Sequence, residues 1–283
     1  MHSLYGGLTL STLDLFFIAV TQLGEEWFYI VAISVIYWAI DKKTGKRLMA
    51  LLLTSLWLNC IIKDIFKLPR PPVEERKISV EGYGFPSGHS QGSTTLWGYL
   101  TLRFRNKLLA FSSVIIIALV SYSRIYLRVH YWYDVIGGIV LGLIIIMLFN
   151  TIEKKVTPVL FEMPIIHKML TVMMISALMI IIPLIAFPGE ILEIFATLSG
   201  IVLGAGLGFI CEERSITFLT ENLDLKKRVI RITIGLLLIF GIIFLLKAIF
   251  PHETLLIRYL RYALLGFIMS AVIPLIFKKI EKE

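Results

Sequence analysis

Long apolar runs separated by short polar connections dominate the sequence. As a helix, each run can cross a hydrocarbon layer roughly 30 Å thick, because lipid offers no hydrogen-bond partner to an open backbone. The runs cover residues 28–40, 48–62, 90–102, 108–120, 135–149, 170–187, 191–211, 229–250 and 258–277. We therefore predict an all-α fold, a polytopic transmembrane helical bundle with about nine spans.

The N-terminal stretch 8–23 differs from these runs because it carries Asp14, Thr21 and Gln22. No lysine or arginine precedes it, so it lacks the charged start of a signal peptide. We interpret residues 1–24 as an interfacial or half-inserted helix, with a complete span as the alternative.

Composition supports the membrane assignment. Hydrophobic residues make up 57% of the 283 residues and charged residues 17%, and the mean hydropathy is +0.84. These values exclude an ordinary soluble globular domain and indicate an integral membrane protein surrounded by membrane lipids. The net charge of +8 fits basic loops facing anionic lipid, and we expect no nucleic acid partner. Cys60 and Cys211 lie in apolar runs, which predicts two buried free thiols.

Basic residues cluster in alternate connections, which the usual bias places on the cytoplasmic side of a membrane. Two connections, 63–89 and 123–133, hold lysine and arginine although they fall on the opposite side. Because a basic group near a membrane core is costly, these exceptions indicate a function. We expect an active surface on the extracytoplasmic side of a bacterial plasma membrane.

The exceptional connections carry groups suited to a phosphoryl group. Lys63 and Arg70 lie in "KDIFKLPRPP", and Arg124 lies in "SRIYLRVHYWYD". Within "GFPSGHSQGS", Ser87 supplies a hydroxyl and Gly88 a backbone N–H near the start of the next span. Phosphoryl oxygens need such fixed donors, so we predict that these five residues bind phosphate.

Two histidines offer the chemistry of phosphoryl transfer. His130 and Asp134 are four residues apart, so on a helical turn Asp134 can accept from one ring nitrogen while the other attacks phosphorus. His89 is the predicted acid for the departing lipid oxygen and later the base for water. Structural hydrogen bonding and metal ligation are the alternatives. Three cations beside two histidines and one carboxylate argue against a metal, and we predict no cofactor.

The ordered set K-x6-R-P, P-S-G-H and S-R-x5-H-x3-D resembles the three-part motif of the type 2 phosphatidic acid phosphatase superfamily, with every fixed position present. The resemblance covers roughly residues 27–149. It implies a membrane-embedded helical bundle that removes phosphate from lipids without a metal, through a phosphohistidine intermediate. The superfamily also includes soluble vanadium haloperoxidases, which the hydropathy argues against.

We predict a membrane lipid phosphatase that hydrolyses a phosphomonoester or diphosphate at the outer leaflet and releases inorganic phosphate. Polyprenyl diphosphate, phosphatidic acid, phosphatidylglycerol phosphate and sphingoid phosphate are the candidate substrates. The alternative is a lipid carrier or transporter that holds phosphate headgroups in its basic cluster.

The predicted division of the chain is an N-terminal helix at 1–24, a catalytic helical bundle at 25–154 and a C-terminal transmembrane helical extension at 155–283. Small residues in "SGIVLGAGLGF" predict close helix packing. Packing within the chain is the default interpretation, and a homodimer face is the alternative.

Overall fold

The computed structural model describes residues 11–187, 192–250 and 254–281. Across these ranges the chain is helical and forms no strand, as the apolar runs predict. It divides into two compact units, one of Met1–Ile30 with Thr54–Glu153 and one of Val31–Leu53 with Lys154–Glu283. The predicted functional division at residues 154–155 stays a prediction. The second unit takes residues 31–53 together with the C-terminal helices.

Seven stretches of the described chain are long and apolar enough to cross a membrane. They are α3 (Lys42–Phe66), α5 (Lys107–Tyr126), α6 (Trp132–Glu162), α7 (Ile165–Ala186), α8 (Leu192–Cys211) with its extension to Ile216, α9 (Leu225–Ile249), and α10 (Leu255–Phe267) continuing through α11 (Ile273–Ile280). The protein is therefore an integral membrane protein, but the predicted count of about nine spans is not confirmed.

The difference in count comes from two places. The α4 helix, Gly88–Phe104, has only 17 residues, or about 26 Å of helix. The N-terminal helices α1 (Thr12–Thr21) and α2 (Glu26–Val35) belong to a pair bent by 52°, which would give an eighth span if counted as one. The predicted separate interfacial helix is likewise not confirmed, and residues 1–10 of that prediction lie outside the described ranges.

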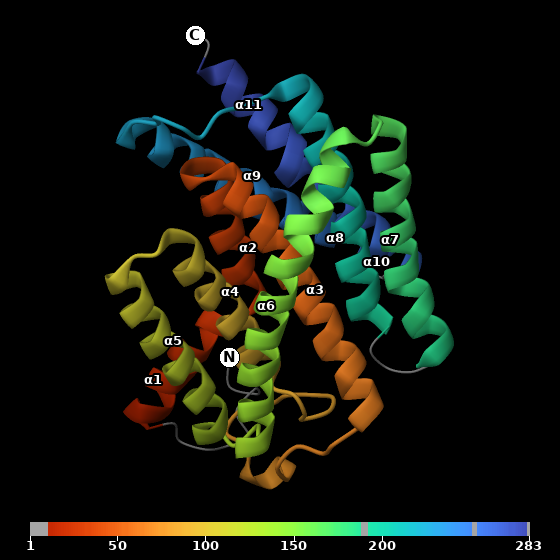
Figure 1. The fold of residues 1–283 in the computed structure, drawn as a ribbon. Coiled ribbons are helices and arrows are strands. Elements are labelled where there is room, and N and C mark those ends of the chain that lie inside the picture. The colour runs from red at the N-terminus through yellow and green to blue at the C-terminus, as the bar shows by residue number, and fades with distance from the viewer. Residues whose placement is uncertain (1–10, 188–191, 251–253, 282–283) are drawn as a thin grey trace. The chain divides into compact units, whose positions relative to one another are not determined.

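The N-terminal helix α1 packs against α5 in the first unit (Figure 1). The Phe17 ring lies 4.3 Å from the Tyr126 ring and 5.5 Å from the Tyr122 ring, measured between centroids. Leu127 and Val129, just after α5, complete this small core. Asp14 and Thr21, two of the polar residues that set the N-terminal stretch apart in sequence, therefore belong to a helix with an apolar contact face.

Glycines on α6 bring that helix close to the start of α4. A methyl group on Gly138 would lie 2.6 Å from the Ser87 carbonyl oxygen, and one on Gly142 would lie 2.9 Å from the Thr94 side chain. Neither position has room for a larger residue without a shift of the backbone. This close approach places the motif Pro86–His89 beside the N-terminal part of α6.

Small residues on α8 serve helix packing inside the second unit. Gly200 and Gly204 face the backbone of α10 at Tyr259 and Ala263, and Gly206 faces Val172 on α7. The default interpretation, packing within the chain, accounts for these glycines. A homodimer remains a prediction with no face assigned to it.

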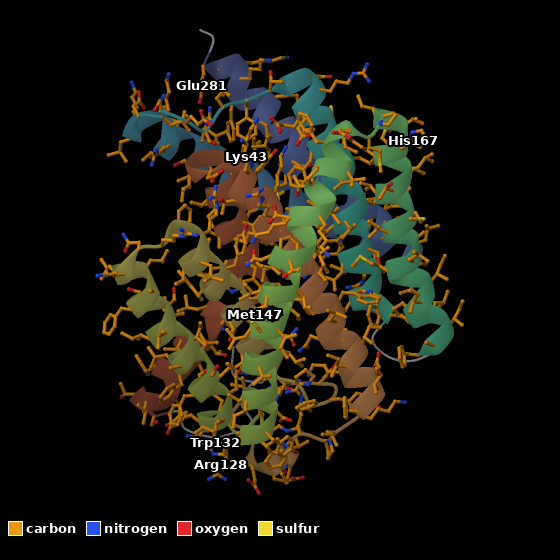
Figure 2. The ribbon with its side chains drawn as sticks, viewed as in Figure 1. Lys43, Arg128, Trp132, Met147, His167 and Glu281 are labelled. Carbon is orange, nitrogen blue, oxygen red and sulfur yellow. The ribbon has the colours of Figure 1, made fainter. Side chains whose placement is uncertain are left out.

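Charged residues are also buried in the second unit. Glu212 is fully buried and binds Lys42 at 2.9 Å and Lys46 at 2.7 Å. Arg231 holds Glu281 through two bonds of 2.6 Å, at the end of the unit where Figure 2 labels both Lys43 and Glu281. These charges are paired, so they account for part of the polar sequence of the C-terminal helices. Cys60 is buried as predicted, whereas Cys211 is half-buried.

Candidate active site

The three sequence motifs meet at one end of the first unit. Figure 2 labels Arg128 and Trp132 at this end of α6 and Met147 farther along the helix. The Arg70 Nη1 donates to the Val129 carbonyl at 3.0 Å, which ties the first motif to the third. The Ser87 backbone N–H donates to the Asp134 carbonyl at 2.9 Å, which ties the second motif to the third.

The His130 side chain is buried and held by two partners. Its Nδ1 lies 3.2 Å from the Asp134 Oδ2, and its Nε2 lies 2.8 Å from the Arg70 Nη1. A guanidinium has donors only, so Nε2 must be the acceptor and must carry the lone pair. The hydrogen is therefore on Nδ1 and is donated to Asp134. In this tautomer Nε2 is the ring nitrogen whose lone pair could act as a nucleophile.

The charge state of His130 follows from its surroundings. Burial lowers the pKa of the His130 imidazole well below its ordinary value, and the positive charges of Arg70, Arg124 and Lys63 lower it further. The ring is therefore neutral at physiological pH. A neutral imidazole is the form that can attack phosphorus.

Local structure explains the orientation of Asp134. The residue lies in the first turn of α6, and its Oδ2 also accepts the Tyr131 backbone N–H at 2.9 Å. Gly84 leaves room for this carboxylate, since a methyl group there would lie 3.0 Å from the same oxygen and 3.1 Å from the Pro69 carbonyl. Its other oxygen, Oδ1, is buried without a hydrogen-bond partner within the described ranges.

Lys63 and Arg70 shape the loop between α3 and α4. The Lys63 Nζ donates to the carbonyls of Tyr83 and Gly84 at 2.7 and 3.2 Å, and the Arg70 Nε donates to the Gly82 carbonyl at 3.0 Å. Burial, followed by the nearby Arg76, lowers the pKa of Arg70 to about 10, which still leaves the guanidinium charged at neutral pH. Backbone oxygens thus hold both cations near His130.

Arg124 is the third cation, and only 2% of it is exposed. Its Nη1 donates to the Thr21 hydroxyl at 2.6 Å, while its Nε has no hydrogen-bond partner in the described part of the chain. Its positive charge disfavours a positive charge on Lys63, His89 and His130. The carboxylate of Glu25 is near enough to offset part of this charge, but no carboxylate among the described residues forms an ion pair with Arg124, so the guanidinium can also bind a phosphoryl group.

Ser87 and Gly88 begin α4, and Ser87 is its N-cap. The Ser87 hydroxyl accepts from the Ser90 hydroxyl at 3.1 Å and from the Ser90 backbone N–H at 3.5 Å. In both bonds the Ser87 oxygen is the acceptor, and the Ser87 hydroxyl hydrogen is not donated to any residue that the structure describes, so it can be donated to an anion. The predicted phosphate-binding role of both residues remains a prediction.

The second histidine, His89, lies in the first turn of α4. Its Nε2 is 3.1 Å from the Glu25 Oε1, at the start of α2. A methyl group on Gly24 would lie 2.7 Å from the His89 Cδ2, so the turn before α2 rests directly on the imidazole. His89 and His130 are close enough for the charge of one to affect the other.

Sequence reasoning missed four polar residues that support this site. Thr21 belongs to the stretch 1–24 that the sequence predicts as a separate helix, and Glu25 is the first residue of the predicted catalytic bundle. Asn59 donates to the Pro86 carbonyl and to Gln91, and thereby holds the loop before His89. Asn59 and Gln91 could have been found as amides inside apolar runs.

The fold and the site together define a class of protein: a helical membrane protein with a buried His–Asp pair among three cations. Residues 45–158 match the profile of the PAP2 superfamily, and residues 196–283 match that of the PAP2 superfamily phosphatase, transmembrane extension. The chain belongs to the PAP2 superfamily, as the three-part motif predicts.

Curated relatives are phosphatases of lipid phosphates. Sphingosine-1-phosphate phosphatase 2 of Mus musculus is 31% identical over 137 residues, which cover 44% of this chain and 38% of that protein. The chain thus spans less than half of the length of this relative. Sphingosine-1-phosphate phosphatase 1 of Rattus norvegicus is 26% identical over 313 residues, which cover 91% of this chain and 70% of that protein.

The crystal structure of the transmembrane PAP2 type phosphatidylglycerolphosphate phosphatase from Bacillus subtilis is also similar. The two sequences are 25% identical, and the match covers 52% of this chain and 80% of the Bacillus subtilis chain, with a TM-score of 0.45.

Proposed function

We propose that this protein is a lipid phosphate phosphatase that works through a phosphohistidine on His130. The observation that carries the proposal is the tautomer of His130, whose Nδ1–H is bound by Asp134 and whose Nε2 lone pair faces the cation Arg70. A purely structural histidine does not need three cations around it.

In the first step the His130 Nε2 attacks phosphorus and forms a P–N bond. The P–O bond to the lipid breaks, and its electron pair stays on the lipid oxygen, which takes a proton from His89. Before this attack, the Arg70 Nη1 must give up its hydrogen bond to the His130 Nε2 and donate to a phosphate oxygen instead. Lys63, Arg70 and Arg124 then balance the charge of the transferring group.

In the second step water attacks the phosphohistidine. His89 accepts a proton from that water, the P–N bond breaks, and inorganic phosphate leaves with His130 neutral again. One residue thus serves as the acid and then as the base, a role worth roughly 10²–10⁴-fold in rate.

The substrate class in this proposal is a membrane lipid bearing a phosphomonoester or a diphosphate. The candidates remain polyprenyl diphosphate, phosphatidic acid, phosphatidylglycerol phosphate and sphingoid phosphate. Sphingoid phosphate is the first to test, because the similarity to the sphingosine-1-phosphate phosphatase extends over 91% of the chain. Measuring the phosphate released from each of the four lipids in detergent micelles would show which one the protein prefers.

A lipid carrier is the second candidate function, since the cations alone would hold a phosphate headgroup. The deciding experiment is phosphate release by purified His130→Ala protein, with lipid binding measured on the same sample. We expect no release and retained binding, because the alanine removes the nucleophile but none of the cations. His167→Ala, an exposed histidine on α7, is the matched control. Equal release by the His130→Ala and wild-type proteins would contradict the proposal.

A further inference from the structure

We propose that Glu25 is the positioning residue for His89, so that the N-terminal turn Thr21–Glu25 completes the active site. This inference rests on the proposed function, because it concerns the proton that His89 gives to the lipid oxygen. Its basis is the 3.1 Å contact between the Glu25 Oε1 and the His89 Nε2.

The charges around His89 make a carboxylate necessary. An acid catalyst must carry its proton when the lipid oxygen departs. Burial and the positive charges of Arg124 and Arg70 lower the pKa of His89 to about 4, while the hydrogen bond and the negative charge of Glu25 act in the opposite direction. Glu25 in turn faces the positive charges of His89 and Arg124. Among these neighbours it is the group that stabilises the imidazolium.

The geometry also assigns the two ring nitrogens. Gly24 rests on the Cδ2 edge of the ring, and Glu25 binds the adjacent Nε2. That edge is occupied by the N-terminal turn, which leaves Nδ1 to give its proton to the lipid oxygen. The two histidines therefore use opposite nitrogens: Asp134 holds the Nδ1 of His130, and Glu25 holds the Nε2 of His89.

The same turn contacts Arg124, one of the predicted phosphate-binding cations. Thr21, one turn before Glu25, accepts from the Arg124 Nη1 at 2.6 Å. Thr21 is buried, and Glu25 is partly exposed, with 39% of its side chain accessible. Thr21 thus orients a cation for the phosphate, and Glu25 orients the acid for the leaving group.

The test is Glu25→Gln, which preserves the shape and a hydrogen bond but removes the charge. Two substrates with the same chain separate proton donation from binding: dodecyl phosphate, whose alkoxide needs a proton, and a dodecyl-substituted nitrophenyl phosphate, whose phenolate departs without one. We expect kcat/KM to fall roughly 10²-fold for the first and by no more than about threefold for the second.

The pH profile gives a second readout that a structural role would not move. Without Glu25 the protonated form of His89 is less stable, so the alkaline limb for dodecyl phosphate should begin at a lower pH. Glu26→Gln, the same change at the exposed neighbouring residue, should leave both readouts at wild-type values.

Three results would overturn the assignment. Equal losses for the two substrates would mean that Glu25 has a structural role only. A rise in kcat/KM for dodecyl phosphate would mean that the carboxylate competes with the phosphate. An unchanged alkaline limb would mean that Glu25 does not stabilise the protonated ring. Failure of the proposed function is recognised separately, because His130→Ala would then release phosphate as fast as the wild type.

Discussion

Replacing Asp134 with asparagine should remove a negative charge from the site and leave its shape intact. Asp134 is fully buried, and its Oδ2 binds both the His130 Nδ1 and the Tyr131 N–H. The amide oxygen can occupy the Oδ2 position and keep both bonds. Any large loss of phosphatase activity would therefore report the missing charge rather than a collapsed site.

The magnitude can be worked from the distance. When His130 attacks phosphorus its ring becomes positive, and opposite unit charges 3.2 Å apart interact by about 5 kcal/mol at an effective dielectric constant of 20. Since about 1.4 kcal/mol changes a rate tenfold, loss of this full interaction corresponds to roughly 10³–10⁴ in kcat. Relaxation of the neighbouring cations would reduce the effect, so we expect a loss between roughly 10² and 10⁴.

The same substitution should change stability little. The amide nitrogen would take the place of Oδ1, which is already buried without a partner in the described ranges. One unsatisfied buried group, which costs about 1–3 kcal/mol, replaces another, so the melting temperature in detergent should stay close to that of the wild type. Asp224→Asn is the matched control, because Asp224 caps α9 and asparagine is an equally good cap. A folded Asp134→Asn protein with a turnover within about tenfold of the wild-type rate would refute this account.

Two further predictions concern metals and membrane sidedness. Turnover in detergent should survive EDTA and be inhibited by vanadate, since the cations Lys63, Arg70 and Arg124 take the place of a metal; activity lost with EDTA and restored by magnesium would contradict the site. A cysteine at the exposed Ser79, in a background without Cys60 and Cys211, should react with an impermeant maleimide on intact cells, whereas one at the exposed Lys43 should react only after permeabilisation. The reverse pattern would place the site on the cytoplasmic side.

Helices and spans differ in how well the sequence predicts them. Each predicted apolar run coincides with a helix wherever the structure describes it, because an apolar segment in lipid must satisfy its own backbone. The count of spans depends on tertiary structure. Whether α1 and α2 form one bent span or two shorter helices is decided by the bend near Glu25, and hydropathy carries no signal for such a bend.

The candidate site was predictable where chemistry follows spacing. His130 and Asp134 are close because they are four residues apart, and Arg70 and Lys63 stood out as cations on the side poor in positive charge. Glu25 lies 64 residues before its partner His89. An acidic residue before an apolar run is also what an ordinary helix start looks like, so neither its position nor its type indicated a partner.

The N-terminal turn reaches the site because α1 is anchored near its start and in its middle. Near its start, the Asp14 carboxylate binds the Lys77 Nζ at 2.5 Å and the Tyr126 hydroxyl at 3.0 Å, and the bond to Asp14 raises the pKa of Lys77. In the middle, Phe17 packs against the end of α5. These contacts hold the turn in place without any contribution from Glu25. The effect of Glu25→Gln should therefore stay at His89, because the position of the turn does not depend on the bond that the substitution weakens.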